Sequence, residues 1–180
     1  MTPGAAVFAA DRGSLTAGGA VLLDGPEGRH AATVRRLRAG ERVLLTDGAG
    51  RLAGCVVTEV RRDALALDVV HVVDEPAPRP RLVVVQALPK GDRGEVAVET
   101  LTEVGADVVV PWAAHRCVTQ WRAERGERAL SRWRSTAREA AKQSRRAWWP
   151  RVAPLASTAE VAELVRGAAL GVVLHEGADA

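Results

Sequence analysis

The sequence predicts an all-β unit followed by an α/β unit, and three observations support this two-part fold. Residues 74–81 read DEPAPRPR, and a run with three alternating prolines is typical of an extended linker, because it joins neither a helix nor a sheet. Before this linker, short strand-like runs are separated by turn residues, as in a small barrel. After it, continuous apolar runs alternate with helix signals, as in a parallel sheet. We therefore expect domains at 1–73 and 82–180.

The composition is typical of a folded protein from a reducing compartment. The chain has 180 residues, of which 47% are hydrophobic and 26% charged, and this excludes a disordered chain. Cys55 and Cys117 have no CxxC spacing and the histidines form no HxxxH or HxH pair, so neither a disulfide framework nor a metal site is expected. The first residues lack a basic signal-peptide region, and no run approaches the roughly 20 apolar residues of a membrane span. We expect a cytoplasmic protein without membrane contact.

The first unit is predicted to contain four strands and one short helix. Residues 42–46 and 51–60 form a hairpin around the turn DGAG, and 64–73 add a third strand. Earlier, VLLDGPEG supplies one more strand followed by a turn at GPEG. The exception to the β pattern is 28–40, where a short helix with Ala32, Val34 and Leu37 facing inward is expected to end near Gly40.

The second unit is predicted as a β-α-β unit with further helices. Strand 82–88 is followed by a helix that begins at the capping-box pair Asp92 and Glu95 and ends at Gly105. Strand 107–111 completes a right-handed crossover. A long helix is expected from about residue 122 to 146, a second capping box at Ser157 and Glu160, and a third buried strand at 170–175.

Positive charge is concentrated in one segment. Residues 116–151 hold 11 basic residues against three glutamates, a balance of +8, whereas the whole chain carries +3. A solvated helix face is the alternative explanation, but so few acids leave most of the arginines unpaired, and phosphates would relieve their repulsion. We therefore favour nucleic-acid contact. The basic arc of the long helix comprises Arg128, Arg132, Arg134, Arg138, Lys142, Arg145 and Arg146.

A second basic cluster precedes the first hairpin. Two arginine-rich patches on two units joined by a short linker suggest one RNA-binding surface that spans both units. Trp148 and Trp149 lie beside the basic arc and either stack on bases or belong to the core or an interface, which is the commoner place for tryptophan at a helix end. The second cluster comprises Arg29, His30, Arg35, Arg36 and Arg38.

The spacing of the residues alone reveals no set of catalytic side chains. Lys90 and Arg93 of KGDRGE follow the first strand of the α/β unit, at the sheet edge where open α/β folds bind ligands. Neither GPEG nor KGDRGE matches a dinucleotide or P-loop pattern. His115 and Cys117 are two positions apart on a loop, but they do not by themselves make a nucleophile and its base.

Four segments in this order and at these spacings resemble the RsmE-type family of 16S ribosomal RNA uridine-N3 methyltransferases. They are HAATVRRLRAGERVLLTDGAG, ALPKGDRGEVAVETLTEVGAD, VVPWAAHRCV and AREAAKQSRRAWWPRV. The resemblance implies an N-terminal PUA-like barrel for RNA binding and a C-terminal SPOUT domain, a Rossmann-like sheet with a knot that binds S-adenosylmethionine. It also implies a homodimer that acts on 16S rRNA of the small ribosomal subunit.

The motif matches of this resemblance and the two basic clusters together give candidate roles for individual residues. Glu95, Glu103, Gly105 and Cys117 match motif positions without an assigned contact. Because a pocket rich in arginine favours the uridinate anion, Arg116 and Arg146 are the catalytic candidates. Uridine N3 lies on the Watson-Crick edge, so the base must be unpaired or flipped before it reacts. The RNA-binding candidates are His30, Arg35, Arg36, Arg38, Lys90, Arg93, Arg138, Lys142, Gln143 and Arg145.

The sequence departs from the family pattern in two places. Arg145 stands where glycine is usual and Lys142 where glutamate is frequent, and both changes add positive charge. The GPEGG loop and the following segment that build the knot have no counterpart in these 180 residues, so no cofactor-binding residue is assigned and we expect this chain alone neither to bind the cofactor nor to catalyse. Two alternatives remain open at this point: a non-catalytic RNA-binding or ribosome-assembly module, and a fragment whose basic helix meets an acidic protein.

Overall fold

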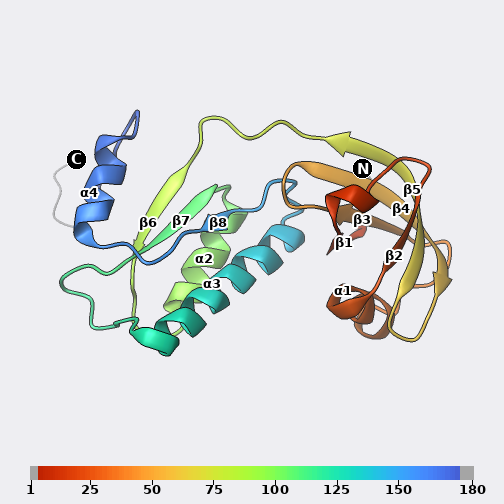
Figure 1. Ribbon diagram of the computed structural model, residues 1–180, viewed down its shortest axis with the longest axis horizontal. Coiled ribbons are helices and arrows are strands. Elements are labelled where there is room, and N and C mark those ends of the chain that lie inside the picture. The colour runs from red at the N-terminus through yellow and green to blue at the C-terminus, as the bar shows by residue number, and fades with distance from the viewer. Residues whose placement is uncertain (1–3, 175–180) are drawn as a thin grey trace.

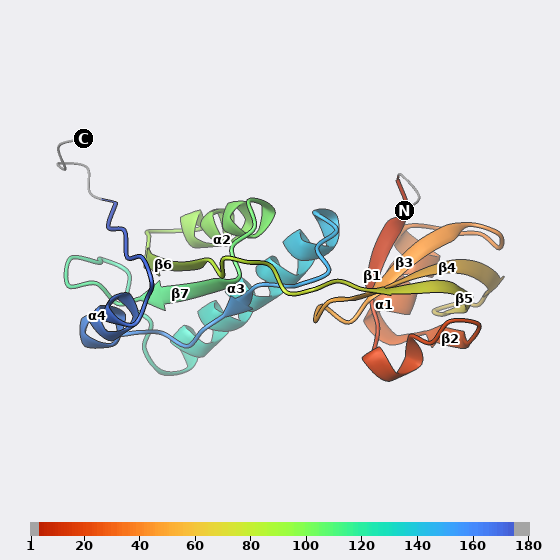
Figure 2. The ribbon, with the colours of Figure 1, turned by 90° about the horizontal axis from the view of Figure 1, so that it is seen from above.

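The computed structural model describes residues 4–174, and its first part is a curled five-stranded sheet (Figures 1 and 2). The strands are β1 (Ala6–Ala9), β2 (Ala20–Leu23), β3 (Arg42–Thr46), β4 (Arg51–Val60) and β5 (Leu65–Asp74). They lie in the order β1-β3-β4-β5-β2, with β1 parallel to β3 and the other pairs antiparallel. The curl encloses a core that includes Phe8, Leu45, Leu65 and Leu67.

The predicted strands of this unit are confirmed to within one residue at 42–46, 51–60 and 65–74. The hairpin was recognisable because Gly48 and Gly50 both take positive φ angles, of 69° and 99°, in the turn between β3 and β4. Strand β1 was missed, because four residues give too short a pattern to detect.

The helix in this unit begins earlier and ends earlier than predicted. GPEG is not a turn but the start of α1 (Gly25–Arg29), since the fixed φ of Pro26 suits the first helical turn. The helix continues as a π-helical turn over His30–Val34, closed by a hydrogen bond from Arg35 N–H to the His30 carbonyl. Because a π turn is wider than an α turn, the buried position shifts to Ala31, and Val34 is exposed rather than inward-facing.

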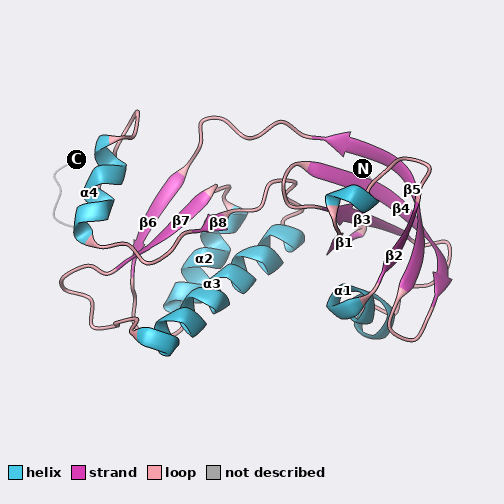
Figure 3. Cartoon of the chain, viewed as in Figure 1, coloured by secondary structure: helices cyan, strands magenta, loops and turns pink. Residues whose placement is uncertain are grey.

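The second part is a three-stranded parallel sheet with helices on its faces (Figure 3). Strands β6 (Val83–Ala87), β7 (Val108–Trp112) and β8 (Arg151–Val152) lie in that order. Helices α2 (Arg93–Glu103) and α3 (Ala123–Gln143) cover the face that carries Val109, with Val98 and Trp133 in the core between them. Val108 and Val110 face the other side, where Val161 of α4 (Thr158–Arg166) packs.

The β-α-β unit is confirmed, but the third strand is not where the sequence placed it. Residues 170–174 form no strand, and Leu170 and Leu174 are 81% and 94% exposed. A strand needs a neighbour for its N–H and C=O groups, and this segment pairs with no other strand in the described range 4–174. The two-residue β8 pairs with β7 instead. Residue 175, the last of the predicted strand, lies outside the described residues.

The two helix-start predictions differ in outcome. Ser157 and Glu160 form the expected capping box: the Ser157 hydroxyl accepts from the Glu160 N–H at 3.3 Å, and the Ser157 N–H donates to the Glu160 carboxylate at 2.7 Å. Helix α2 begins at the expected place, but the Asp92 side chain makes no capping hydrogen bond. None of the helices between residues 4 and 174 is both long enough and apolar enough to cross a membrane.

The tandem tryptophans connect the two units. Trp149 donates its backbone N–H to the Gly48 carbonyl at 2.9 Å, and the Trp148 indole donates to the Glu75 carbonyl at 2.9 Å. Gly48 and Gly50 leave room for the two indole rings, which a Cβ atom at either position would strike. Of the two interpretations of these tryptophans, the structure supports the interface and not a free stacking surface.

Candidate nucleic-acid interface

Basic and polar residues from both units meet in one hollow, which we call the basin. His30 and Arg35 come from the N-terminal unit, while Lys142, Gln143 and Arg145 come from the end of α3 and the turn after it, more than 100 positions later in the chain. They line a cavity of about 120 Å³ together with the backbone around β1. The fold therefore unites five of the RNA-binding candidates. Arg36 and Arg38 are exposed on the segment after the π-helical turn and do not line the basin.

Most of the basic arc is already paired within the chain, so the expectation that most of its arginines are unpaired is wrong. The acids that sequence reasoning missed lie on other elements: Glu95 pairs with Arg132 at 3.1 Å, and Glu27 of α1 pairs with Lys142 at 3.0 Å. Partners of the other four are Glu124 for Arg128, the Val152 carbonyl for Arg134, Glu27 for Arg138 and Asp107 for Arg146. Within residues 4–174, Arg145 alone of the arc makes no side-chain hydrogen bond or ion pair.

Glu27 acts as a clamp between the units. Its carboxylate accepts from Lys142 at 3.0 Å and from Arg138 at 3.4 Å. The Lys142 side chain is only 9% exposed and also meets Glu139 at 2.8 Å, while the Arg138 guanidinium lies 5.1 Å from the centre of the Trp149 ring. Both basic residues were predicted to bind RNA, and in this structure both join α3 to Glu27 of the N-terminal unit.

Arg145 occupies a backbone conformation that favours glycine. After α3 ends, the Arg145 N–H bonds the Lys142 carbonyl and the Arg146 N–H bonds the Ala141 carbonyl, which is the pattern of a Schellman motif. The motif needs a left-handed residue, and Arg145 has φ 55°. The glycine usual in the resembled family would fit without strain, so the arginine keeps a free cation in the basin at a cost in stability.

We expect Arg145→Gly to raise the free energy of unfolding by about 1 kcal/mol, because the left-handed strain is removed. The same change removes a free charge from the basin, so affinity for RNA should fall. Urea unfolding and RNA binding by fluorescence anisotropy measure the two effects. Arg145→Lys is the matched control, since it keeps both the strain and the charge. A variant that is less stable than the parent would contradict this account of position 145.

The Arg146 side chain binds oxygen atoms inside the C-terminal unit. Its guanidinium donates to the carbonyls of Thr102 and Ala106, at 3.0 and 2.6 Å, and lies 3.3 Å from the Asp107 carboxylate. Burial lowers the pKa of Arg146, and the charge of Asp107 opposes this shift. These contacts tie the end of α3 to the end of α2 and the start of β7.

The two catalytic candidates lie at opposite ends of β7. Arg146 contacts Asp107, just before the strand, whereas Arg116 follows the strand on an exposed loop. Five residues of strand separate the two positions, which corresponds to about 16 Å. The structure therefore does not bring them together within one chain. On the same loop, His115 is exposed and Cys117 packs partly against the core.

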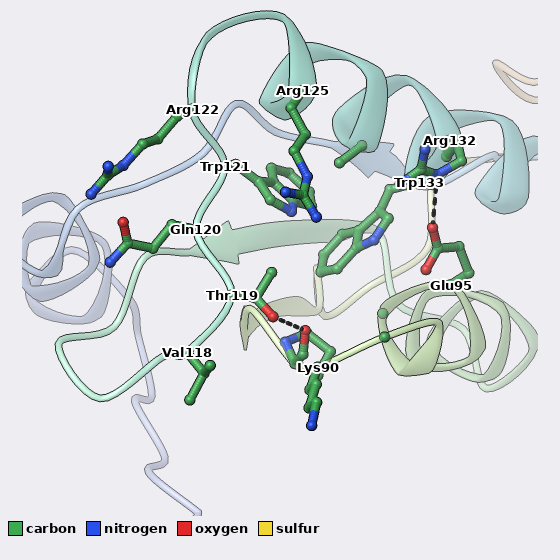
Figure 4. A pocket seen from close by; sticks show the side chains of 14 residues that line it. Lys90, Glu95, Val118, Thr119, Gln120, Trp121, Arg122, Arg125, Arg132 and Trp133 are labelled. Carbon is green, nitrogen blue, oxygen red and sulfur yellow. Dashed lines mark hydrogen bonds and ion pairs between the residues drawn. The ribbon is translucent and has the colours of Figure 1, made fainter.

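A larger pocket opens at the carboxyl edge of β6 and β7, and we call it the carboxyl-edge pocket (Figure 4). Its cavity has a volume of about 530 Å³. Lys90 belongs to it, but Arg93 does not line it. Sequence reasoning did not bring its other main residues together, although Trp121 and Arg122 lie on the loop after a parallel strand, which was a usable signal. These are Glu95, Trp121, Arg122, Arg125, Arg132 and Trp133.

The described residues contain no cluster of three or more histidine, cysteine, aspartate or glutamate side chains that could hold a metal ion. The Cys55 thiol is buried in the first core, and burial raises its pKa to about 11. A thiol with this pKa stays protonated at neutral pH, and therefore Cys55 is a packing residue and not a nucleophile.

Comparison with known proteins gives consistent matches. A family model described as an RNA methyltransferase domain matches residues 75–180, and one described as an RNA methyltransferase PUA domain matches 23–70. Ribosomal RNA small subunit methyltransferase E from Mycobacterium bovis is 48% identical over 166 residues, which cover 89% of this chain and 63% of that protein. The protein of the same name from Bacillus subtilis is 28% identical over 155 residues, covering 86% of this chain and 60% of that protein.

A solved structure shows the same similarity in three dimensions. The crystal structure of ribosomal RNA small subunit methyltransferase E from Neisseria gonorrhoeae, bound to S-adenosyl methionine, matches with a TM-score of 0.75 and 25% identity. The match covers 87% of this chain and 64% of that one. The chain thus spans less than two thirds of the length of the curated relatives described above.

Proposed function

The chain belongs to the RNA methyltransferase domain family, and on this premise we propose that the protein methylates ribosomal RNA of the small subunit with S-adenosylmethionine as the methyl donor. Following the resemblance in the motifs, we propose N3 of a uridine in 16S rRNA as the target atom. The protein acts in the cytoplasm as a homodimer on the RNA or on the small ribosomal subunit.

The observation that carries this proposal is the basin. RNA-binding proteins use cations to hold the backbone in register, and here two units of the fold each contribute residues to one positively charged hollow. Arg35 and Arg145 have no ion-pair partner among the described residues, so both are free to meet phosphates. The basin, which lies between the two units, then holds the RNA in one orientation while a single base is presented to the second unit.

Methylation at uridine N3 requires that its proton leave and that the resulting negative charge be stabilised. A guanidinium can stabilise that charge, and Arg116 is exposed on the loop that follows β7, at the carboxyl edge of the sheet. We assign this role to Arg116. Arg146 already uses its guanidinium for two carbonyls and Asp107, so we assign it a positioning role.

The lining of the carboxyl-edge pocket does not fit the cofactor. The carboxyl-edge pocket is lined by Lys90, Arg122, Arg125 and Arg132, and Glu95 is its one acid. The Glu95 carboxylate is already paired with Arg132 at 3.1 Å. Such a lining would repel the positively charged sulfonium of S-adenosylmethionine, so no cofactor contact is assigned in this part of the chain.

Deleting the gene tests the proposed activity directly. We expect N3-methyluridine to disappear from digests of small-subunit rRNA and to return when the gene is supplied on a plasmid, as measured by mass spectrometry. A gene encoding Arg116→Ala should restore at least tenfold less methylation, because the uridinate loses its stabilising charge, whereas the exposed variant Arg128→Ala should restore it fully. An unchanged amount of N3-methyluridine after deletion would remove the proposal.

A further inference from the structure

The carboxyl-edge pocket has the size and lining of a nucleotide site. Its volume of about 530 Å³ lies in the range of pockets that enclose small ligands. It is separate from the basin, since the two cavities share no lining residue. Its walls come from the loops that follow β6 and β7 and from the starts of α2 and α3 (Figure 4).

The charge of this pocket favours an anion. Arg132 is neutralised by Glu95 at 3.1 Å. Lys90, Arg122 and Arg125 make no ion pair among residues 4–174, and all three are exposed. Three cations without acidic partners around one cavity attract a phosphate, because the ligand would remove their mutual repulsion.

The aromatic lining favours a base. The rings of Trp121 and Trp133 are 5.0 Å apart and nearly perpendicular. Trp133 is 2% exposed and cannot stack on a ligand, but Trp121 is only half-buried. Gly94 permits the close approach of Trp133 and Gly126 that of Trp121, since a Cβ at these positions would meet atoms of the two tryptophans at 2.6 and 3.0 Å. Trp121 is thus a partly open aromatic surface that packs edge-on against Trp133.

The side chains are arranged so that one ligand contacts both the free cations and the Trp121 ring. Figure 4 shows Arg125 extending from the start of α3 toward Trp121, with Trp133 beside it and Lys90 on the opposite wall. The loop that carries Trp121 is fixed across the pocket, because the Thr119 hydroxyl donates to the Pro89 carbonyl at 2.8 Å. A base on Trp121 therefore places its phosphate within the field of Arg125 and Lys90.

We propose that the carboxyl-edge pocket binds one nucleotide of single-stranded RNA, with its base against Trp121 and its phosphate held by Arg125 and Lys90. The proposal rests on the proposed function in so far as RNA is the substrate. It adds a second contact point, on the side of the C-terminal sheet where Arg116 lies. A strand that crosses from the basin to this pocket would be held at two places, and one base between them would be free to leave the stack.

Binding of short RNA to the purified chain tests this proposal. Pentauridylate should quench tryptophan fluorescence, uridine 5′-monophosphate should do so at higher concentration, and inorganic phosphate alone should give no quenching. We expect Trp121→Leu to abolish most of the quenching and to weaken pentauridylate binding about tenfold, as measured by anisotropy of a labelled oligonucleotide. Arg125→Gln should weaken binding by a similar factor.

Arg128→Gln is the matched control, because Arg128 lies one helical turn further along α3, is exposed and pairs only with Glu124. It should bind like the parent. Arg125 is exposed, so its replacement leaves the fold intact even if loss of Trp121 disturbs the packing against Trp133. Parental binding by Arg125→Gln overturns the proposal, as does quenching that survives in Trp121→Leu. The rRNA methylation assay is independent of these binding measurements. A result that overturns the nucleotide site is therefore distinguishable from one that overturns the proposed methylation activity.

Discussion

Arg146→Ala is expected to lower the free energy of unfolding by about 3 kcal/mol. The change leaves the Asp107 carboxylate without its cation and the Ala106 carbonyl without the guanidinium donor, while the Thr102 carbonyl keeps only the Gly105 N–H. All of these groups lie where the end of α3 meets the end of α2 and the start of β7. Buried polar groups that lose their partner cost more than the net gain of the hydrogen bond itself.

Urea unfolding measures this decrease, with Arg128→Ala as the exposed control from the same helix. The control should lie within about 0.5 kcal/mol of the parent. Arg146→Lys should be intermediate, because an ammonium keeps the charge but does not reproduce the planar fork of donors. If Arg146→Ala were as stable as the parent while rRNA methylation was abolished, Arg146 would be catalytic and the positioning role assigned to it would be wrong.

The second large effect is expected in the basin. Arg35→Gln and Arg145→Gln together should weaken binding of a single-stranded rRNA fragment by at least tenfold at physiological salt, because both are free cations of one hollow. Each single variant should show part of this decrease in affinity. The two residues come from different units, so coupling between them in a double-mutant cycle would show that one RNA segment meets both.

The exposed variant Arg166→Gln is a suitable control for this pair, since Arg166 lies at the end of α4 and pairs with Glu163. It changes the net charge by one without touching the basin. An equal decrease in affinity for the control and for the basin variants would mean that the affinity for RNA depends only on the net charge of the protein.

Local signals in the sequence were sufficient for much of the fold. The turn between β3 and β4 has glycines at its positive φ angles, and the helix at Ser157 has both members of its capping box. Such features depend on residues within a few positions of one another. Strand β8 was not predictable in this way, because two residues carry no periodicity and its place depends on pairing with β7.

The ion pairs were beyond sequence reasoning for a similar reason. Glu27 is 115 positions before Lys142, and nothing local indicates that α1 will lie beside the end of α3. The surplus of arginine in one segment was therefore overestimated as free charge. A smaller set of free cations remains, and it includes Arg145, which lies in the left-handed position of a Schellman motif. Family resemblance identified the position, but only the backbone angle explains why arginine there is costly.

The salt dependence of RNA binding tests most directly the central claim that both units present one RNA surface at the basin. Affinity for a single-stranded rRNA fragment should be measured from about 50 to 200 mM salt for the parent and for the double variant Arg35→Gln, Arg145→Gln. If each side chain meets one phosphate, the slope of the log-log plot should become shallower by about 1.4, which is about 0.7 for each phosphate of a single strand that is no longer neutralised. A slope equal to that of the parent would contradict the claim, because it would mean that neither arginine meets a phosphate.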